Sequence, residues 1–211
     1  MEENLLNNML YHDIIECLAA ALDAKDSYTC GHSLRVSDMS YDLAGKIGIG
    51  GAELESIHIA GHLHDIGKIG VPDYVLNKST KLSEEEWRQI KKHPEHGYNI
   101  LSKSSSLKEI ARIVLYHHER WDGKGYPEGL AGTDIPIGAR IIAVCDTIDA
   151  MTSARPYREP FSWEECRREV ERNAGLQFDA ELVEAAASLW DKWESNSKQQ
   201  SYAYIENINT R

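Results

Sequence analysis

Paired histidines and acids stand out in this sequence because they lie at the ends of apolar stretches. His64 and Asp65 are adjacent within HDIGK, and His117 and His118 are adjacent within HHE. His117 also continues the helical spacing of the apolar residues before it, which directs its ring inward. A buried imidazole needs a partner for its nitrogens, and a metal ion is a partner that several histidines can share. One inward histidine is more often a hydrogen-bonded core residue, but two such pairs on separate helices favour a metal centre.

Asp146 supports the same interpretation from a third segment. It lies within the apolar stretch IIAVCDTIDAM, where a lone carboxylate would be costly to bury. Asp146 could be a helix cap or one half of a buried salt bridge. Alternatively it is a metal ligand, because mixed imidazole and carboxylate sets suit iron, manganese or zinc. None of the four cysteines lies at ligand spacing from another, so the sequence offers no thiolate site.

The elements that must position these residues are helical almost throughout. Apolar residues recur every four residues from Leu6 to Leu22, which predicts a long first helix. Residues typical of helix starts predict further helices, at the capping boxes of Ser83 and Ser162, at Pro136 and at Asp179. Because the alternation typical of strands is scarce, we expect an all-α fold. One domain over residues 1–194 would precede a polar, loosely ordered tail over residues 195–211.

Composition narrows the class of partner. The 211 residues include 34 acids and 23 lysines and arginines, which gives a formal charge of −11. This charge argues against a DNA or RNA polymer, which normally requires a basic face. A small anion stays possible, because metal ions can reverse the sign inside one pocket. The sequence has neither a membrane-spanning apolar run nor a secretory signal. With cysteines that we interpret as reduced core thiols, it is expected to be cytoplasmic.

The sequence resembles the HD-GYP family, a branch of the HD phosphohydrolases. Three motifs occur in the order typical of that family: HDIGK, HHERWDGKGYP and ARPYR. The resemblance runs from about Tyr28 to Leu182 and covers most of the chain. An HD dipeptide alone would be expected by chance, whereas HDIGK followed by HHE and DGxGYP is very specific. The resemblance implies an HD-domain helical bundle with additional C-terminal helices.

The resemblance also implies a binuclear metal site, with iron or manganese as the two divalent ions and Asp65 as the bridge between them. The implied ligands are His32, His64, Asp65, His93, His117, His118 and Asp146. Some relatives carry a glutamate four residues before the first histidine, and it helps to bind a third metal. Tyr28 occupies that position here, so we expect two metals, although Asp23 or Asp26 could supply a third site.

Further roles follow from the resemblance. Lys68 would stabilise charge beside the scissile phosphate and help to relay a proton, although most lysines are simply solvated. Arg155 and Arg158 would bind the substrate phosphates, or else form surface ion pairs. Tyr126, in the GYP segment 125–127, could orient the substrate, and this loop could dock partner proteins. We expect the remaining histidines to be structural or surface residues, namely His12, His58, His62 and His96.

The function implied is hydrolysis of cyclic di-GMP. A hydroxide bridging the two metals would attack phosphorus and give pGpG, and a second cut would give GMP. Two alternatives stay open. The chain could be an HD phosphohydrolase that acts on another nucleotide, including cyclic GMP-AMP, or a non-catalytic module that binds a cyclic dinucleotide or docks a partner. The chain could also form a homodimer.

Overall fold

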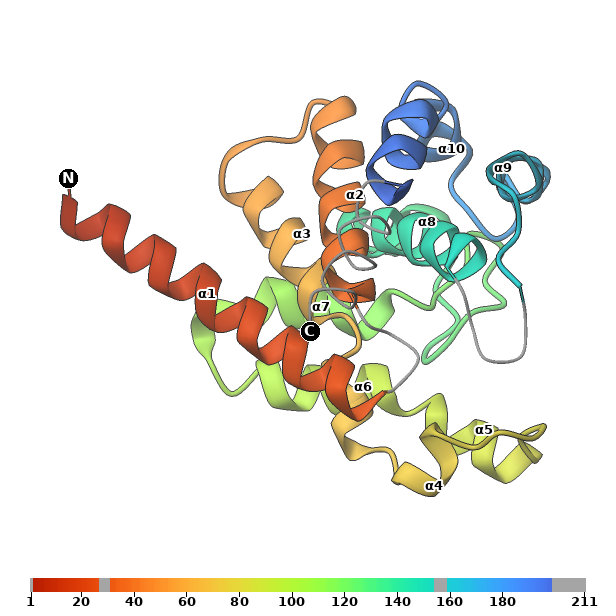
Figure 1. Ribbon diagram of the computed structural model, residues 1–211, viewed down its shortest axis with the longest axis horizontal. Helices are drawn as coiled ribbons and strands as arrows, with labels where there is room; N and C mark the ends of the chain where they lie inside the picture. The colour runs from red at the N-terminus through yellow and green to blue at the C-terminus, as the bar shows by residue number, and fades with distance from the viewer. Residues whose placement is uncertain (1, 27–30, 154–158, 199–211) are drawn as a thin grey trace, which may run out of the picture.

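The computed structural model describes residues 2–26, 31–153 and 159–198 (Figure 1). Within these ranges the chain forms helices and loops, and its strand-like pairing is limited to two isolated bridges. The all-α expectation is confirmed. The α-helices are α1 (Glu2–Lys25), α2 (His32–Lys46), α3 (Gly51–Leu63), α4 (Asp73–Leu76), α5 (Glu84–Ile90), α6 (His93–Leu101), α7 (Lys108–Tyr116), α8 (Ile137–Thr152), α9 (Trp163–Arg172) and α10 (Ala180–Ala186). The 3₁₀ helices are η1 (Ile66–Gly70), η2 (Ser105–Leu107) and η3 (Gly132–Asp134).

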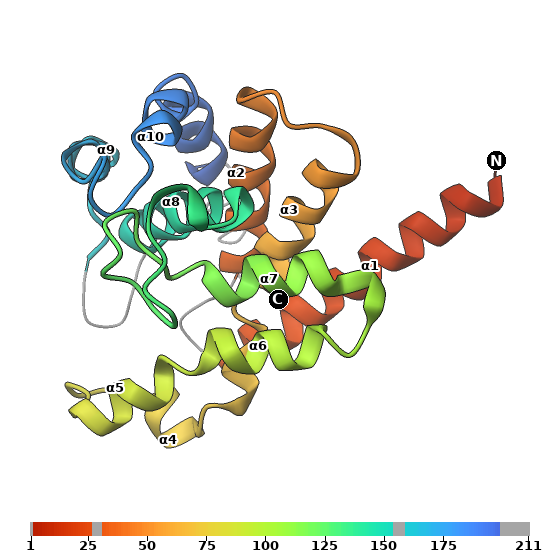
Figure 2. The ribbon, with the colours of Figure 1, turned by 180° about the vertical axis from the view of Figure 1, so that it is seen from behind.

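Four helices surround the core. α2 packs against α3 and α8, and α7 lies against both α3 and α8 (Figures 1 and 2). Leu43, Ile57, Val114 and Ile142 are fully buried between them, and each such side chain contributes about 1.5–3 kcal/mol to stability. α2 and α3 approach very closely, since a Cβ on Gly61 would lie 2.6 Å from the Cα of Ser37. This packing fixes the end of α3, where HDIGK begins.

The first helix projects from the body at its N-terminal end (Figure 1). The periodicity predicts this helix correctly but not its buried face. Ile14 and Leu18 are 49% and 47% exposed, whereas Ile15 and Ala19 are buried together with Leu22, the last residue of the predicted stripe. A strict four-residue spacing drifts around a helix with 3.6 residues per turn. Packing against α3 selects the face that α1 buries.

The C-terminal helices α9 and α10 lie beside α8, and α10 also contacts α2. Both predicted capping boxes are present, at the starts of α5 and α9, and Asp179 caps α10. Residues 190–198 are also helical. Residues 195–198 therefore correct our expectation of a loose tail from residue 195, and residues 199–211 lie outside the described ranges. The assignment of residues 1–194 to one domain stays a prediction.

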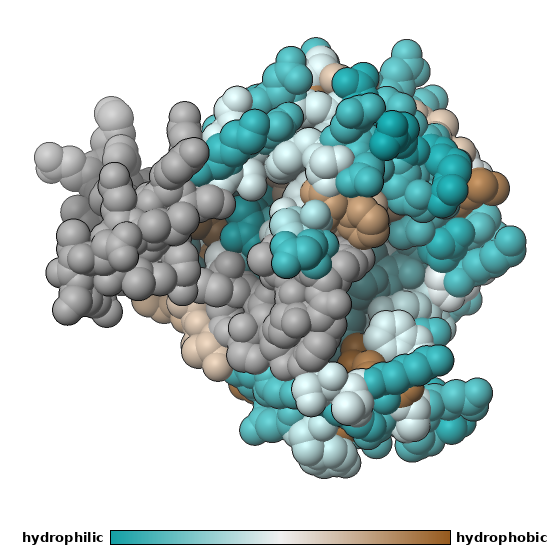
Figure 3. Space-filling view, turned by 45° about the vertical axis from the view of Figure 1, so that its right-hand side comes forward, coloured by the Kyte–Doolittle hydropathy of each residue, from teal (hydrophilic) through white to brown (hydrophobic). Residues whose placement is uncertain are grey.

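The described part of the face seen in Figure 3 is mainly polar. None of the described helices is long and apolar enough to cross a membrane. Cys145 and Cys166 are buried free thiols, as expected for core cysteines. Cys17 is exposed, so its expected place in the core was wrong, and Cys30 lies outside the described residues.

Candidate metal centre

The seven ligands implied by the sequence come together in the structure. Six of them form two groups that could each hold an ion, with one donor atom from each member within 4.8 Å of the others. The first group consists of His32, His64 and Asp146, and the second of His93, His117 and His118. The rings of His64 and His117 lie 5.3 Å apart between centroids, so the two groups are neighbours.

Asp65 lies between the two groups. Its Oδ1 is 3.3 Å from Nε2 of His93, in the second group. Its Oδ2 is 3.5 Å from Nε2 of His64 and 3.8 Å from Nε2 of His32, in the first group. One carboxylate oxygen therefore faces each group, which is the arrangement that a bridging carboxylate requires.

Gly67 brings the HDIGK segment against the helix that carries His93. α3 ends at Leu63, and the chain turns through His64 and Asp65 into η1. A Cβ on Gly67 would lie 1.8 Å from the carbonyl oxygen of His93. No side chain fits in that space, so the glycine of HDIGK allows η1 and α6 to pack closely enough for His93 to reach Asp65.

Three of the candidate ligand histidines are oriented by the main chain. The Nδ1 atoms of His64, His93 and His117 each donate to the carbonyl three residues earlier. The acceptors are Gly61 at 2.7 Å, Ile90 at 2.9 Å and Val114 at 2.7 Å. A neutral imidazole that donates through Nδ1 keeps its lone pair on Nε2. These three Nε2 atoms face the candidate centre.

His32 is oriented by a carboxylate instead. Its Nδ1 lies 2.7 Å from Oδ2 of Asp149, and Arg35 donates to the same oxygen from 3.0 Å. Such carboxylate partners of ligating histidines are a common feature of metal sites. Sequence reasoning missed Asp149. The available signal was its position three residues after Asp146 within an apolar helix, which places both acids on one face.

Burial keeps most of these imidazoles neutral. It lowers the pKa of both His93 and His117 to about 4, and it also lowers the pKa of His64. His32 differs. Burial opposes its protonation, but the hydrogen bond to Asp149 and the charges of Asp149, Asp146 and Asp65 raise its pKa. Neutral rings offer the lone pairs that metal binding needs.

Lys68 lies beside the carboxylate of Asp65, the candidate bridge. Its Nζ is 2.7 Å from Oδ2 of Asp65 and 2.8 Å from Oδ2 of Asp26. Burial lowers the pKa of Lys68, but the two carboxylates outweigh that effect and raise it. Burial likewise raises the pKa of Asp65, yet Lys68 and the neighbouring imidazoles hold it well below its usual range. A cation is thus held at the edge of the site.

The GYP segment closes one side of the centre. Tyr126 stacks on His118 with ring centroids 4.8 Å apart. Glu119, the acid of HHE, is buried, and its Oε1 accepts the backbone N–H groups of Glu128 at 2.7 Å and Gly129 at 2.9 Å. Glu119 therefore ties the GYP loop to the segment that carries His117 and His118.

Several sequence-predicted residues lie elsewhere. Arg155, Arg158 and Tyr28 fall outside the described residues. Asp26 is buried and pairs with Lys68, so the structure gives it a role as counter-charge. His96 lies in α6, where Nδ1 would be 2.5 Å from a Cβ on Gly70.

The donor set fits two divalent transition-metal ions. It combines five imidazoles and two carboxylates, and this mixture suits iron, manganese or zinc. His32 and His64 approach to 3.2 Å between their Nε2 atoms, and His93 and His117 to 3.3 Å. In His93 and His117 the donor to the main chain is Nδ1, so their two Nε2 lone pairs face each other with no proton between them. A metal ion bound by both lone pairs would remove the repulsion between them.

Known proteins resemble the chain over most of its length. A family model described as "HD domain" matches residues 16–182. A cyclic di-GMP phosphodiesterase from Thermotoga maritima is 43% identical over 179 residues, which are 84% of this chain and 49% of that protein. A 3'3'-cGAMP-specific phosphodiesterase 2 from Vibrio cholerae is 39% identical over 86% of this chain and 35% of its own length. The cyclic di-GMP phosphodiesterase response regulator RpfG from Xanthomonas campestris is 39% identical over 88% of this chain and 51% of its own length.

Solved structures share the fold. The crystal structure of a cyclic GMP-AMP-specific phosphodiesterase of V. cholerae matches 86% of this chain and 50% of its own, with a TM-score of 0.66 and 17% identity. The HD domain of the phosphodiesterase PgpH from L. monocytogenes matches 87% of this chain and 98% of its own, with a TM-score of 0.61 and 19% identity. The chain thus spans about half or less of the length of the curated relatives named above.

Proposed function

Because this chain belongs to the HD domain family, we propose that it is a metal-dependent phosphodiesterase that hydrolyses cyclic di-GMP to pGpG, and further to GMP. One observation carries the proposal: Asp65 presents one oxygen to each of two ligand groups. The motifs HDIGK, HHE and GYP supply that arrangement, and the cyclic di-GMP phosphodiesterases from Thermotoga maritima and Xanthomonas campestris are similar to this chain.

The protein side chains around the centre suit phosphodiester hydrolysis. Two divalent ions held there would supply Lewis-acid chemistry that activates water and binds phosphate oxygens. Asp65 and the buried histidines would hold those ions, and the side chains of Asp65, His32, His64, His93 and His117 are shielded from solvent. The Nζ of Lys68 is positioned to stabilise the negative charge that develops on the phosphoryl oxygens and to help relay a proton.

Contacts to the rest of the substrate are also part of the proposal. Tyr126 lies over His118 at the edge of the centre, where its ring would orient a nucleotide. Arg155 and Arg158 would hold the phosphates through their planar guanidinium groups. These two arginines follow α8, which carries Asp146, so the sequence places them close after a metal ligand.

We propose that the two ions are iron or manganese, since a set of imidazole and carboxylate ligands suits either metal. Cyclic GMP-AMP is the second candidate substrate, because a similar chain from V. cholerae is named as specific for it. A non-catalytic binding role is less favoured, since the chain retains all seven candidate ligands and Lys68. A cytoplasmic location, a homodimer and the docking of partner proteins on the GYP loop stay predictions.

Product analysis tests the proposal. The protein would be purified without oxygen, loaded with Fe(II) or Mn(II), and incubated separately with cyclic di-GMP and cyclic GMP-AMP. Asp65→Ala, which removes the bridging carboxylate, serves as the matched inactive variant. We expect pGpG or GMP from the intact protein and none from Asp65→Ala. Equal product from both proteins would refute the site assignment. Cleavage of cyclic GMP-AMP alone would identify that dinucleotide as the substrate in place of cyclic di-GMP.

A further inference from the structure

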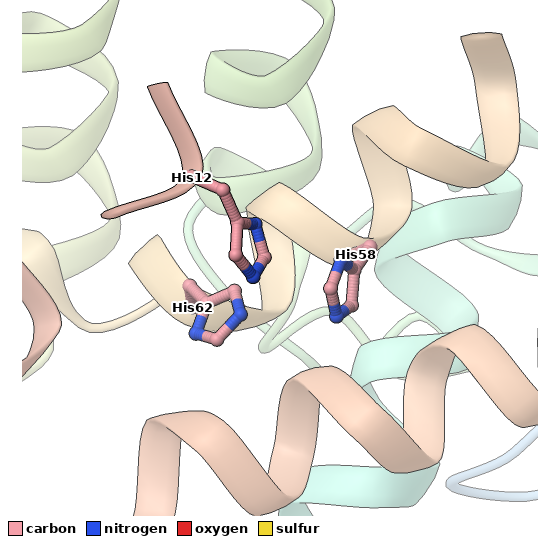
Figure 4. A group of neighbouring side chains, drawn as sticks. All are labelled: His12, His58 and His62. Carbon is pink, nitrogen blue, oxygen red and sulfur yellow. The ribbon is translucent and has the colours of Figure 1, made fainter. Parts of the chain in front are cut away.

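Three histidines gather outside the candidate metal centre, where α1 packs against α3. His12 comes from α1, and His58 and His62 come from successive turns of α3 (Figure 4). The ring centroids lie 5.4 Å apart for His12 and His58, 5.6 Å for His12 and His62, and 5.0 Å for His58 and His62. Figure 4 shows the three rings gathered around a common space.

His62 is the unusual member of this group. It is only 1% exposed, and neither of its ring nitrogens has a hydrogen-bond partner among the described residues. A buried polar group without a partner costs about 1–3 kcal/mol. In contrast, each buried histidine of the candidate metal centre either forms a hydrogen bond through Nδ1 or lies against other candidate ligands. Simple packing therefore leaves the nitrogens of His62 unexplained.

We propose that His12, His58 and His62 form a separate binding site for a divalent transition-metal ion, best suited to Zn²⁺. One nitrogen from each ring lies within 4.8 Å of the others. Zinc binds imidazole nitrogens at about 2.0–2.1 Å in tetrahedral geometry, so the three nitrogens would close to about 3.3 Å. Each side chain would need to move by at most about 1 Å to reach that geometry. Imidazole also ranks among the preferred ligands of zinc.

The spacing of the donors supports this assignment. His58 and His62 are four residues apart, so their side chains lie on one face of α3. His12 meets that face from the neighbouring helix, which makes the site a link between two elements. His12 is 37% exposed at its side chain, so an ion can enter from solvent while His62 stays buried.

A carboxylate is available as the fourth ligand. Oε1 of Glu16 lies 3.2 Å from Nε2 of His12, one helical turn along α1. Asp38 on α2 lies 4.0 Å from Nε2 of His58. Glu16 is half exposed and free to rotate toward the ion, so three nitrogens and one oxygen would complete a closed tetrahedral set.

An ion at this site would clamp α1 onto α3. α1 ends at Lys25 beside Asp26, which pairs with Lys68, and α3 leads directly into His64 and Asp65. Both helices therefore end at the candidate metal centre. An ion that binds the folded chain and not the unfolded chain adds stability that depends on its concentration. The clamp would thus hold the catalytic segment against α1.

Zinc stoichiometry of the full chain tests the proposal. His12→Gln and His58→Gln each remove one ligand at a position that is not fully buried, so the fold should survive. His96→Gln is the matched control, because His96 belongs to neither group of ligands. After dialysis against micromolar free Zn²⁺, we expect one fewer zinc equivalent in His12→Gln and in His58→Gln than in the wild type or in His96→Gln.

Two further readings complete the test. Circular dichroism of the metal-free proteins establishes that the variants fold, and Zn²⁺ should raise the Tm of the wild type more than that of His12→Gln. Zinc content and Tm are both measured without any hydrolysis, so this result does not depend on the proposed function. Equal zinc content and equal Tm shifts in the wild type and both folded variants would overturn the proposal.

Discussion

The Nζ of Lys68 lies 2.7 Å from Oδ2 of Asp65, the same oxygen that faces His32 and His64. The oxygen through which Asp65 would reach the metal of the first group is therefore also the oxygen that contacts Lys68. Asp26 holds the lysine from its other side at 2.8 Å, which fixes the position of Nζ before any substrate arrives.

Lys68→Ala should separate turnover from metal binding. The seven ligands are untouched by this change, so metal content should stay at the wild-type level. Loss of a positioned charge next to the reacting phosphate should lower kcat by about 10²–10³-fold. Metal analysis and product formation would be measured together. Lys25→Ala, which breaks an ion pair with Asp73 at 2.7 Å, is the control; wild-type turnover in Lys68→Ala would contradict the role given to Lys68.

Asp149→Asn should weaken metal binding without removing a ligand. Asp149 orients His32 through Nδ1 at 2.7 Å, and loss of such a partner typically costs 10–100-fold in affinity or activity. We expect a similar rise, of about 10–100-fold, in the dissociation constant of the metal in the group of His32. Ser153→Ala, which removes a neighbouring hydroxyl 3.3 Å from Asp149, should have little effect. Unchanged affinity in Asp149→Asn would show that Asp149 does not position His32.

Gly67→Ala should disturb the fold and the site together. Its Cβ would lie 1.8 Å from the carbonyl oxygen of His93 and 2.5 Å from the backbone nitrogen of Gly97, and neither backbone atom can move freely. We expect a loss of about 3 kcal/mol, or a Tm lower by about 6–12 °C. Gly45→Ala is the matched control, because a Cβ there meets nothing within 4 Å and should stabilise α2 by about 1 kcal/mol. Similar melting temperatures for the two variants would rule out the close approach.

The metal-free protein should lose stability as the pH falls from about 6.5 to about 4. Burial lowers the pKa of His93 and His117 from 6.5 to about 4. In that window the unfolded chain binds protons that the folded chain does not, so the free energy of unfolding decreases. His32 is no counterweight there, because its raised pKa leaves it protonated in both states. Urea unfolding at pH 7 and pH 5 measures the change, and His93→Gln should reduce it; an increase in stability at pH 5 would contradict the assignment.

Sequence reasoning predicts the helices, and the residues that gather at the candidate metal centre, better than it predicts their surroundings. His117 continues an apolar helical stripe, and its burial follows from that phase. Periodicity alone could not decide that Ile15 rather than Ile14 faces the core, because the neighbouring helix makes that choice. Asp149 lies three residues after Asp146, which places it on the same helix face, but its partner His32 is 117 residues away in the chain, so the sequence could not name that partner.

The histidines outside the motifs show the same limit. We expected His12, His58 and His62 to be structural or surface residues, and each taken alone fits that description. Only the packing of α1 on α3 brings them within 4.8 Å of one another. A cluster formed by two helices far apart in sequence has no spacing rule by which it could be recognised.

Main-chain carbonyls fix the tautomers of His64, His93 and His117, and this has a genetic consequence. A carbonyl oxygen belongs to every amino acid, so no single codon change at the three accepting positions can delete the acceptor itself. His32 has no such protection, because its partner is the side chain of Asp149. Of these four histidines, only His32 can therefore lose its orienting partner through an amino-acid substitution at the partner's position.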